Sequence, residues 1–111
     1  MAAVALFLTL VAQHSVLPFD GSTPTSIEGT VARVLWQNPH TLVAIDVGHD
    51  RWTIESEGST ILQRLGWTSG SLKTGDRIIV TGARAKDGRR FMRCTTIRLD
   101  DRQLPCFVSP S

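Results

Sequence analysis

Hydrophobic and polar residues alternate over three stretches in the first half of the chain, at residues 27–36, 43–47 and 51–55. A period of two is typical of β-strands, in which successive side chains point to opposite faces. In the first stretch the alternation changes phase between Val31 and Val34, which predicts a strand with a bulge or a strong bend. We therefore expect three consecutive strands, of which the first is long and curved.

A short helical pattern follows the third predicted strand. Ile61, Leu62 and Leu65 have the spacing of one helix face. Ser59 is a residue type preferred at the N-cap, and Gly66 is a type preferred just after the last turn. The pattern predicts a helix of about two turns.

Two further strands are expected after the helix, at residues 77–82 and 90–99, with Asp87-Gly88 as the tight turn between them. Three strands, one helix and two strands, with a long bent first strand, is the order of the OB-type barrel. We therefore predict a mainly β protein, a small five-stranded OB-like barrel with one short helix between strands three and four.

The first twelve residues, Met1 to Ala12, carry no charge and are almost entirely apolar. They are too short for a membrane span, which needs about 20 residues, but they fit the apolar part of a secretory signal peptide that lacks its basic start. We expect residues 1–12 to be a signal peptide, residues 13–26 a linker and residues 27–111 a single barrel domain. The mature chain would then be periplasmic or secreted and have no membrane span. A buried N-terminal strand is the alternative interpretation.

The chain has two cysteines, Cys94 and Cys106. A turn signal at Asp100-Asp101 lies between them, so the two thiols would face each other approximately across a hairpin. A disulfide fits an oxidising compartment such as the periplasm. Two unpaired core cysteines fit the sequence almost equally well, and both arrangements stay open at this point.

A chain of 111 residues with 41% hydrophobic residues can bury one core, since domains cluster at about 100 to 150 residues. The formal net charge of +2 does not by itself indicate a nucleic-acid partner. Five cations gather around the hairpin with the Asp87-Gly88 turn, namely Arg84, Lys86, Arg89, Arg90 and Arg93. Binding of single-stranded nucleic acid also needs aromatic stacking platforms, and only Phe91 lies within this cluster. We therefore expect a solvated basic hairpin.

The segment Trp36-Gln37-Asn38-Pro39-His40 separates the first two predicted strands. Proline fixes φ and moves the preceding residue out of the helical region, so Asn38-Pro39 predicts a turn. The turn would present Trp36, Asn38, Pro39 and His40 at one strand end, as a surface for a ligand or a partner. The three tryptophans of the chain also fit packing in the core or at the end of the barrel.

An ordered series of motifs runs through most of the chain: Gln13-His14-Ser15, Phe19-Asp20, Gly29-Thr30-Val31, Trp36-Gln37-Asn38-Pro39-His40, Trp52, Leu65-Gly66-Trp67, Leu72-Lys73-Thr74-Gly75-Asp76, Thr81-Gly82 and Asp87-Gly88. In this series the chain resembles a family of small secreted bacterial proteins of unknown function, the domain of unknown function 6152 type. Trp-x-Asn-Pro-His is the most specific element. The resemblance implies export and a small β-barrel, and it implies no activity. Members often begin their mature part with His-His-Ser, where this chain has Gln13 in place of the first histidine.

The sequence contains no Gly-x-Ser-x-Gly elbow, His-Glu-x-x-His pair, Cys-x-x-Cys motif or phosphate-binding glycine loop. Glu55 and Glu57 would share a strand face, as an acid–base pair does, but two solvated carboxylates at a strand end are far commoner. We interpret them as surface residues and expect no enzyme activity.

Two functional hypotheses follow. The first is a non-catalytic binding module of the periplasm that recognises a protein or a small ligand through the barrel face around Trp36 and His40. The second is a protein that binds or handles a transition metal, copper or zinc, through His14 and His40, since imidazole suits both ions. The alternative to a metal site is that His40 forms a hydrogen bond within the turn and His14 lies on a flexible tail. Binding of single-stranded nucleic acid through the basic hairpin ranks behind both.

Overall fold

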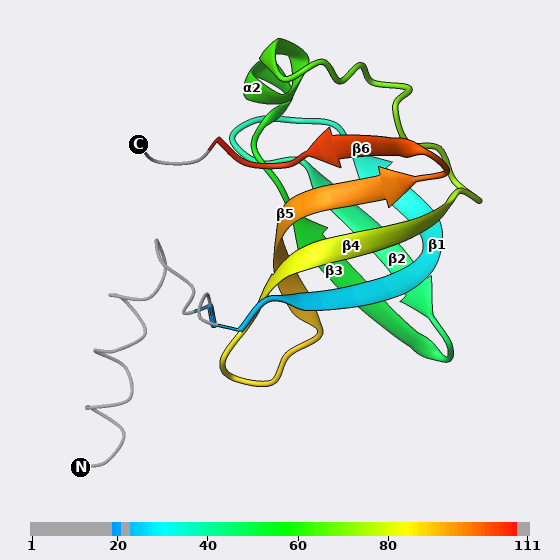
Figure 1. Ribbon diagram of the computed structural model, residues 1–111, viewed down its shortest axis with the longest axis vertical. Coiled ribbons are helices and arrows are strands. Elements are labelled where there is room, and N and C mark those ends of the chain that lie inside the picture. Colours follow the sequence, from blue (N-terminus) through cyan, green and yellow to red (C-terminus); the bar gives the residue numbers. More distant parts are fainter. Residues whose placement is uncertain (1–18, 21–22, 109–111) are drawn as a thin grey trace.

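Six strands and one short helix make up the part of the chain that the structure describes, residues 19–20 and 23–108 of a computed structural model (Figure 1). In chain order they are β1 (Thr25–Leu35), β2 (Leu42–Val47), β3 (Asp50–Glu55), α2 (Ser59–Arg64), β4 (Arg77–Arg84), β5 (Phe91–Leu99) and β6 (Arg102–Pro105). The helix lies between the third and fourth strands, as predicted. The strand β6 is additional to the five predicted strands of the barrel, and it forms with β5 the hairpin expected across Asp100-Asp101.

The first five strands close into a barrel. Antiparallel pairing follows the order β3-β2-β1-β4-β5, and a parallel pairing between β3 and β5 completes the circle. This closing contact is short and runs from Thr53 opposite Phe91 to Glu55 opposite Arg93. The extra strand β6 pairs with β5 outside the closed set. The predicted five-stranded OB-like barrel is confirmed.

The long first strand takes part in both halves of the barrel. Its first half pairs with β4 and its second half with β2. The register with β2 shifts between Val31 and Arg33, and this bulge is the phase change that the sequence predicts. The strands approach closely at Gly29, where a Cβ atom would lie 2.6 Å from the carbonyl oxygen of Asp46. The bend therefore requires a residue without a side chain.

The inward-facing residues of the strands form one hydrophobic core. Its largest fully buried aliphatic side chains from the strands are Val31, Val43, Ile45, Ile54, Ile78, Val80, Met92 and Ile97. Leu62 of α2 and Trp67 beyond it join the same cluster, and the helix lies at one end of the barrel (Figure 1). Full burial of a side chain of this size stabilises the folded state by about 1.5–3 kcal/mol relative to its exposure. The alternation of the strands thus supplies the driving force of the fold.

The helix begins one residue earlier than Ser59 suggests. Gly58 is the N-cap, in an extended conformation, and Ser59 is the first helical residue. The prediction of Ser59 as N-cap is wrong because the capping side chain comes from a distant loop, as described below. The end of the helix agrees with the sequence, since Gly66 has a φ of 100° and its amide donates to the carbonyl of Gln63.

Cys94 and Cys106 form a disulfide. Their Cα atoms lie 5.5 Å apart, and both residues are buried. Cys94 is on β5 and Cys106 follows β6, so the bond ties the extra strand and the segment after it to the barrel. The backbone supports the same attachment, because the amide of Cys106 donates to the carbonyl of Thr95 and that of Glu57 donates to Cys106. Of the two arrangements that the sequence left open, the structure therefore has the disulfide.

The predicted signal peptide at residues 1–12 and the candidate ligand His14 lie outside the described residues. Six residues of the expected linker are described, residues 19–20 and 23–26, and the last two, Thr25 and Ser26, already belong to β1. Phe19 and Asp20 both contact the barrel. Phe19 forms an isolated antiparallel bridge with Ala85, and the amide of Asp20 donates to the carbonyl of Arg84 at 2.9 Å. Within residues 19–20 and 23–108 the only helix is a short one, and none could cross a membrane.

Candidate functional site

The loop between β1 and β2 holds the residues that the sequence singles out, and their side chains contact three different parts of the fold. The ring of Trp36 stacks on that of Trp67, with centroids 6.4 Å apart and planes inclined by 23°. The indole Nε1 of Trp67 donates to the carbonyl of Pro105 at 2.8 Å. Trp36 packs against the core, while Trp52 and Trp67 belong to it. The structural interpretation of the tryptophans therefore holds.

The side chain of Asn38 caps the helix α2. Its Oδ1 accepts a hydrogen bond from the amide of Thr60 at 3.2 Å, and its Nδ2 donates to the Thr60 hydroxyl at 3.2 Å. The amide of Ser59 donates to the carbonyl of Gln37 at 3.0 Å. Two of the free amides at the start of α2 are thus satisfied by a loop about 20 residues away in sequence.

A close approach of two backbones makes this capping possible. A Cβ atom on Gly58 would collide with the side chain of Asn38 and would lie 2.6 Å from the carbonyl oxygen of Pro39. The Asn38–Pro39 peptide bond is cis. The Asn-Pro pair and Gly58 therefore act together as a joint between the loop and the helix.

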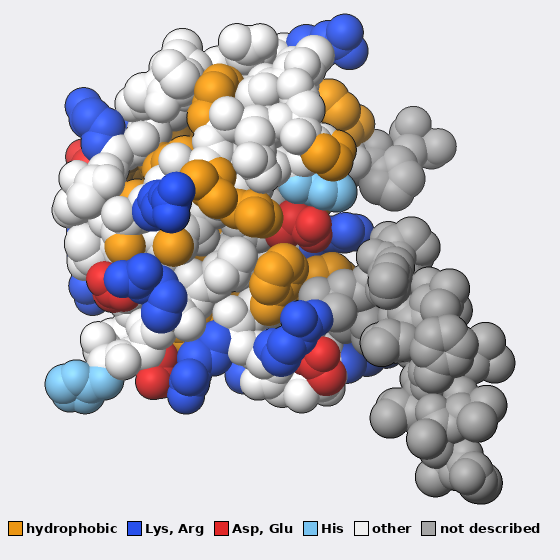
Figure 2. Space-filling view, turned by 180° about the vertical axis from the view of Figure 1, so that it is seen from behind, with side chains coloured by type: hydrophobic (Ala, Val, Ile, Leu, Met, Phe, Trp, Pro, Cys, Tyr) orange, Lys and Arg blue, Asp and Glu red, His pale blue; other side chains and the backbone are white. Residues whose placement is uncertain are grey.

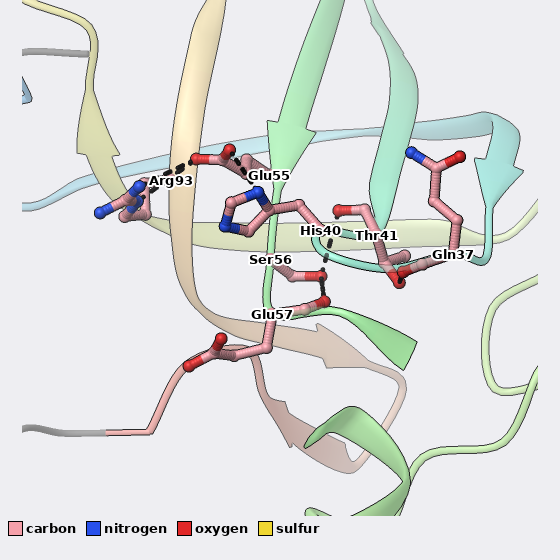
Figure 3. A network of polar contacts seen from close by, with 7 residues as sticks. All are labelled: Gln37, His40, Thr41, Glu55, Ser56, Glu57 and Arg93. Carbon is pink, nitrogen blue, oxygen red and sulfur yellow. Dashed lines mark hydrogen bonds and ion pairs between the residues drawn. The ribbon is translucent and has the colours of Figure 1, made fainter. Parts of the chain in front are cut away.

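His40 points away from this joint, towards Glu55 at the end of β3 (Figure 3). Its Nδ1 lies 3.4 Å from Glu55 Oε2. The other oxygen of Glu55 accepts from Nε and Nη2 of Arg93, at 3.3 and 3.2 Å. The side chain of Glu55 is only 15% exposed, compared with 41% for His40 and 42% for Arg93. The interpretation of Glu55 as a solvated surface carboxylate is wrong, because the barrel closure brings Arg93 to it and the loop between β1 and β2 brings His40.

Behind this triad lies a small polar network whose members are satisfied (Figure 3). The buried hydroxyl of Thr41 donates to the carbonyl of Gln37 at 3.3 Å. The buried hydroxyl of Ser56 is within bonding distance of the carbonyls of Thr41 and Glu57, at 3.3 and 3.1 Å. No buried side-chain nitrogen or oxygen of the described residues lacks a partner. The network therefore stabilises the loop and does not itself indicate a bound group.

A different surface next to His40 is open to a ligand. We call it the outer pocket, a hollow of about 270 Å³ on the outer face of β1, β2 and β3. Its lining residues are Arg33, Leu35, Leu42, Ala44, Arg51 and Thr53. Leu35 pairs with Leu42, and Ala44 pairs with both Arg33 and Thr53, so the lining spans all three strands. Figure 2 shows this side of the molecule, where hydrophobic side chains lie between Lys and Arg side chains.

Charged groups stand at both ends of this outer face. At one end Arg51 donates to Asp46, and this interaction raises the pKa of the Arg51 guanidinium. At the other end Leu42 pairs with Glu55, which brings the outer pocket next to His40 and Arg93. The floor of the outer pocket is thus apolar, and its surroundings are ionic.

Most cations of the basic hairpin are engaged. Arg89 pairs with Asp87, Arg90 with Asp50 and Arg93 with Glu55. Arg84 lies over the Trp52 ring, 5.0 Å from its centroid. The backbone amide of Arg89 also donates to the Asp87 carboxylate and, together with the guanidinium, lowers the pKa of that group. These pairings reduce the charge that a nucleic-acid backbone would meet.

The metal hypothesis rests on His40 and His14, and His14 lies outside the described residues. Within residues 19–20 and 23–108, no group of three histidine, cysteine, aspartate or glutamate residues could hold an ion. His40 has one carboxylate neighbour, Glu55.

Our interpretation of the sequence missed the outer pocket, although the sequence itself contains a signal for this surface. In an alternating strand with one face in the core, the other face is normally polar. Leu42 and Ala44 are apolar at the outward positions of β2, where they alternate with the inward Val43 and Ile45. With Leu35 they form adjacent apolar positions on the outward face, and contiguous apolar surface of this kind is typical of binding sites.

The search of curated proteins finds no match to this chain. The model of one protein family, described as a family of unknown function (DUF6152), matches residues 2–93. This range includes the Trp36–His40 loop, the joint with Gly58 and every residue that lines the outer pocket. The chain belongs to this family of unknown function.

Proposed function

We propose that the protein is an exported, non-catalytic binding module that holds its ligand in the outer pocket. The observation that carries the proposal is the apolar floor formed by Leu35, Leu42 and Ala44 on an outward strand face, between charged ends. OB barrels use the outer face of their second and third strands for ligands, and β2 and β3 supply most of this lining.

The chemistry of the lining favours binding over catalysis. Arginine stays protonated and cannot act as a general base near neutral pH, and leucine and alanine transfer no protons. Among the six lining residues, Thr53 supplies the one hydroxyl group. Side chains of this kind can exclude water and orient a ligand, which is what a binding module needs.

Export is supported by the disulfide between Cys94 and Cys106 and by the apolar start of the chain. Disulfides persist in oxidising compartments such as the periplasm and are rare in the cytosol. Intact-mass analysis of the protein after expression in bacteria, with separate periplasmic and cytosolic fractions, tests this part. We expect an oxidised periplasmic chain that begins near Gln13, and full-length protein confined to the cytosol would contradict export.

Binding is tested by native purification from the periplasm and mass spectrometry of whatever stays bound. Ala44→Glu places a charged side chain in the outer pocket, and Ile79→Glu places the same change on β4, where Ile79 is 38% exposed. The wild type and Ile79→Glu should retain the same bound species, and Ala44→Glu should lose it. Retention of that species by Ala44→Glu, or its absence from the wild type, would contradict the proposal.

A second candidate is a site for copper or zinc that includes His40. The observation that favours it is Glu55 Oε2, 3.4 Å from the Nδ1 atom of the ring. An acceptor at Nδ1 favours the tautomer with the proton there and leaves Nε2 as a metal ligand, an arrangement common around metal-binding histidines. Further ligands would have to include His14 or the amine that processing creates.

Calorimetric titration of the processed protein with Cu(II) and Zn(II) tests this candidate. Binding should weaken in His14→Ala and in His40→Ala, and should weaken about tenfold in Glu55→Gln if the carboxylate orients the ring. His49→Ala is the control, since His49 is exposed in the turn between β2 and β3. Absent binding, or binding that survives both His14→Ala and His40→Ala, would exclude the site.

A further inference from the structure

We infer that the ligand of the outer pocket is a small amphiphilic anion, a short apolar body that carries one carboxylate or a similar group. The inference rests on the proposed function, because it names the class of ligand for the same surface. It follows from the charge, the size and the composition of the lining.

The residues that line the outer pocket carry positive charge, and none of them is acidic. They include two guanidinium groups, those of Arg33 and Arg51. Arg51 uses its Nε atom for Asp46. Arg33 is exposed and has no ion pair or side-chain hydrogen bond within the described part of the chain. A guanidinium beside an apolar floor matches a carboxylate, which it can bind through two parallel hydrogen bonds.

The volume of the outer pocket limits the size of the ligand. A hollow of about 270 Å³ corresponds to about nine water molecules at ~30 Å³ each. A ligand of about ten non-hydrogen atoms, such as an eight-carbon carboxylate, has the right size. Larger amphiphiles would extend beyond the floor into solvent.

The composition of the lining argues against a nucleic acid at the same place. Single-stranded nucleic acids are held by aromatic side chains on which successive bases stack. The six lining residues include no aromatic side chain, and the floor is made of Leu35, Leu42 and Ala44. The surface therefore suits a flexible hydrocarbon better than a planar base.

The test is a titration of the isotopically labelled processed protein with octanoate, followed by amide chemical shifts. Acetate supplies the anion without the apolar body, and octyltrimethylammonium supplies a hydrocarbon chain of nearly the same length with the opposite charge. Octanoate should shift the amides of Ala44 and Thr53 in a saturable way, and the other two compounds should leave them unchanged at equal concentration.

Two variants separate the role of charge from that of the floor. Arg33→Gln should weaken octanoate binding about threefold to tenfold. The control Arg98→Gln removes an exposed arginine of β5 outside the outer pocket and should leave binding unchanged. Ala44→Glu should abolish the shifts. The spectra of the free variants report directly whether each one is folded.

The outcomes distinguish this inference from the proposed function. Equal binding of octanoate and octyltrimethylammonium at these amides would overturn the anionic class and leave the pocket as a binding surface. Octanoate binding unaffected by Arg33→Gln would also overturn the anionic class.

Concentration-dependent shifts of the same amides without ligand would show that a second copy of the chain covers the face, and would overturn the inference. Failure of octanoate while a bound species still co-purifies with the wild type and not with Ala44→Glu would refute the ligand class alone.

Discussion

Asn38 is exposed in the β1–β2 loop, yet its amide group is bonded at both ends to Thr60. A capping side chain of this kind contributes about 0.5–2 kcal/mol to stability. We expect Asn38→Ala to lower the free energy of unfolding by about 1 kcal/mol in urea denaturation, without a change in the slope of the transition. Gln37→Ala is the matched control, because no side-chain contact of Gln37 is part of the joint. Equal effects of the two substitutions would show that the cap contributes nothing.

Gly58 is the partner of Asn38 in the same joint. Its φ of −69° is accessible to any residue, so the restriction at this position is space alone. A methyl group there would meet Asn38 and the backbone of Pro39. Gly58→Ala should therefore cost about 1–3 kcal/mol. In Gly70→Ala the nearest atom lies 3.9 Å away, and thermal or urea denaturation should show little change. A neutral Gly58→Ala would mean that the loop moves aside easily.

For single residues, the sequence predicts the positions of turns and helix ends, but it does not predict which side chains contact each other there. It indicates a turn at Asn38-Pro39 and a helix start near Ser59, and both are present. It could not show that the first caps the second, because the two lie about 20 residues apart and meet only in the folded barrel. The same reason explains Glu55, whose partners His40 and Arg93 come from the β1–β2 loop and from β5.

Among the elements, β6 depends most on a covalent bond. It has four residues and pairs with the barrel through β5. The disulfide between Cys94 and Cys106 closes a loop with a sequence separation of 12, which corresponds to about 3 kcal/mol in the chain-entropy model. The double variant Cys94→Ala/Cys106→Ala should lose about 2–4 kcal/mol of unfolding free energy. Wild-type protein denatured with a reductant should lose a similar amount.

Free-thiol titration of the unfolded, unreduced protein gives an independent measurement for this element. It should find no thiol in the wild type and one in each single variant in which Ala replaces Cys94 or Cys106. If removal of both cysteines leaves the stability unchanged, the hydrogen bonds of β6 and of Cys106 hold the strand by themselves.

Among the properties of the elements, the order of the strands along the chain and their inward faces are the easiest to predict from the sequence. Alternation identifies the first three strands and the bulge in β1, because a core of one layer forces every second residue inward, and the Asp87-Gly88 turn locates the next two strands. The additional strand β6 is less predictable, since Arg102–Pro105 is short and has only one buried residue, Leu104. The parallel closure between β3 and β5 is not encoded locally and follows from the topology.

At the scale of the whole molecule, Arg93 joins three separate parts of the chain. Its guanidinium carbon lies 4.9 Å from the ring centroid of Phe19 and 5.0 Å from that of Phe107, and it also binds Glu55. Contacts of a cation with an aromatic face contribute about 0.5–1 kcal/mol each where they are exposed. We expect Arg93→Ala to lower the free energy of unfolding by about 1–2 kcal/mol and to speed hydrogen exchange at both ends of the described chain.

The amides of Asp20 and Val108 report these two ends. The first donates to the carbonyl of Arg84 and the second to the carboxylate of Glu57. Arg98→Ala removes an exposed arginine of the same strand and should change neither amide. Faster exchange at only one of the two amides in Arg93→Ala would show that the arginine does not couple the ends.

The shared contact with Arg93 also determines where a gene fusion or a rearranged chain can be joined. The rings of Phe19 and Phe107 lie within about 10 Å of each other, since both contact one guanidinium group. A flexible connection of about six Gly and Ser residues, which spans on the order of 13 Å, can link these ends. A circular permutant of residues 19–108 opened at the exposed Gly70 should therefore keep the barrel and its circular-dichroism spectrum. A reporter domain inserted between residues 108 and 19 of such a permutant would likewise be attached at two neighbouring points on one side of the barrel.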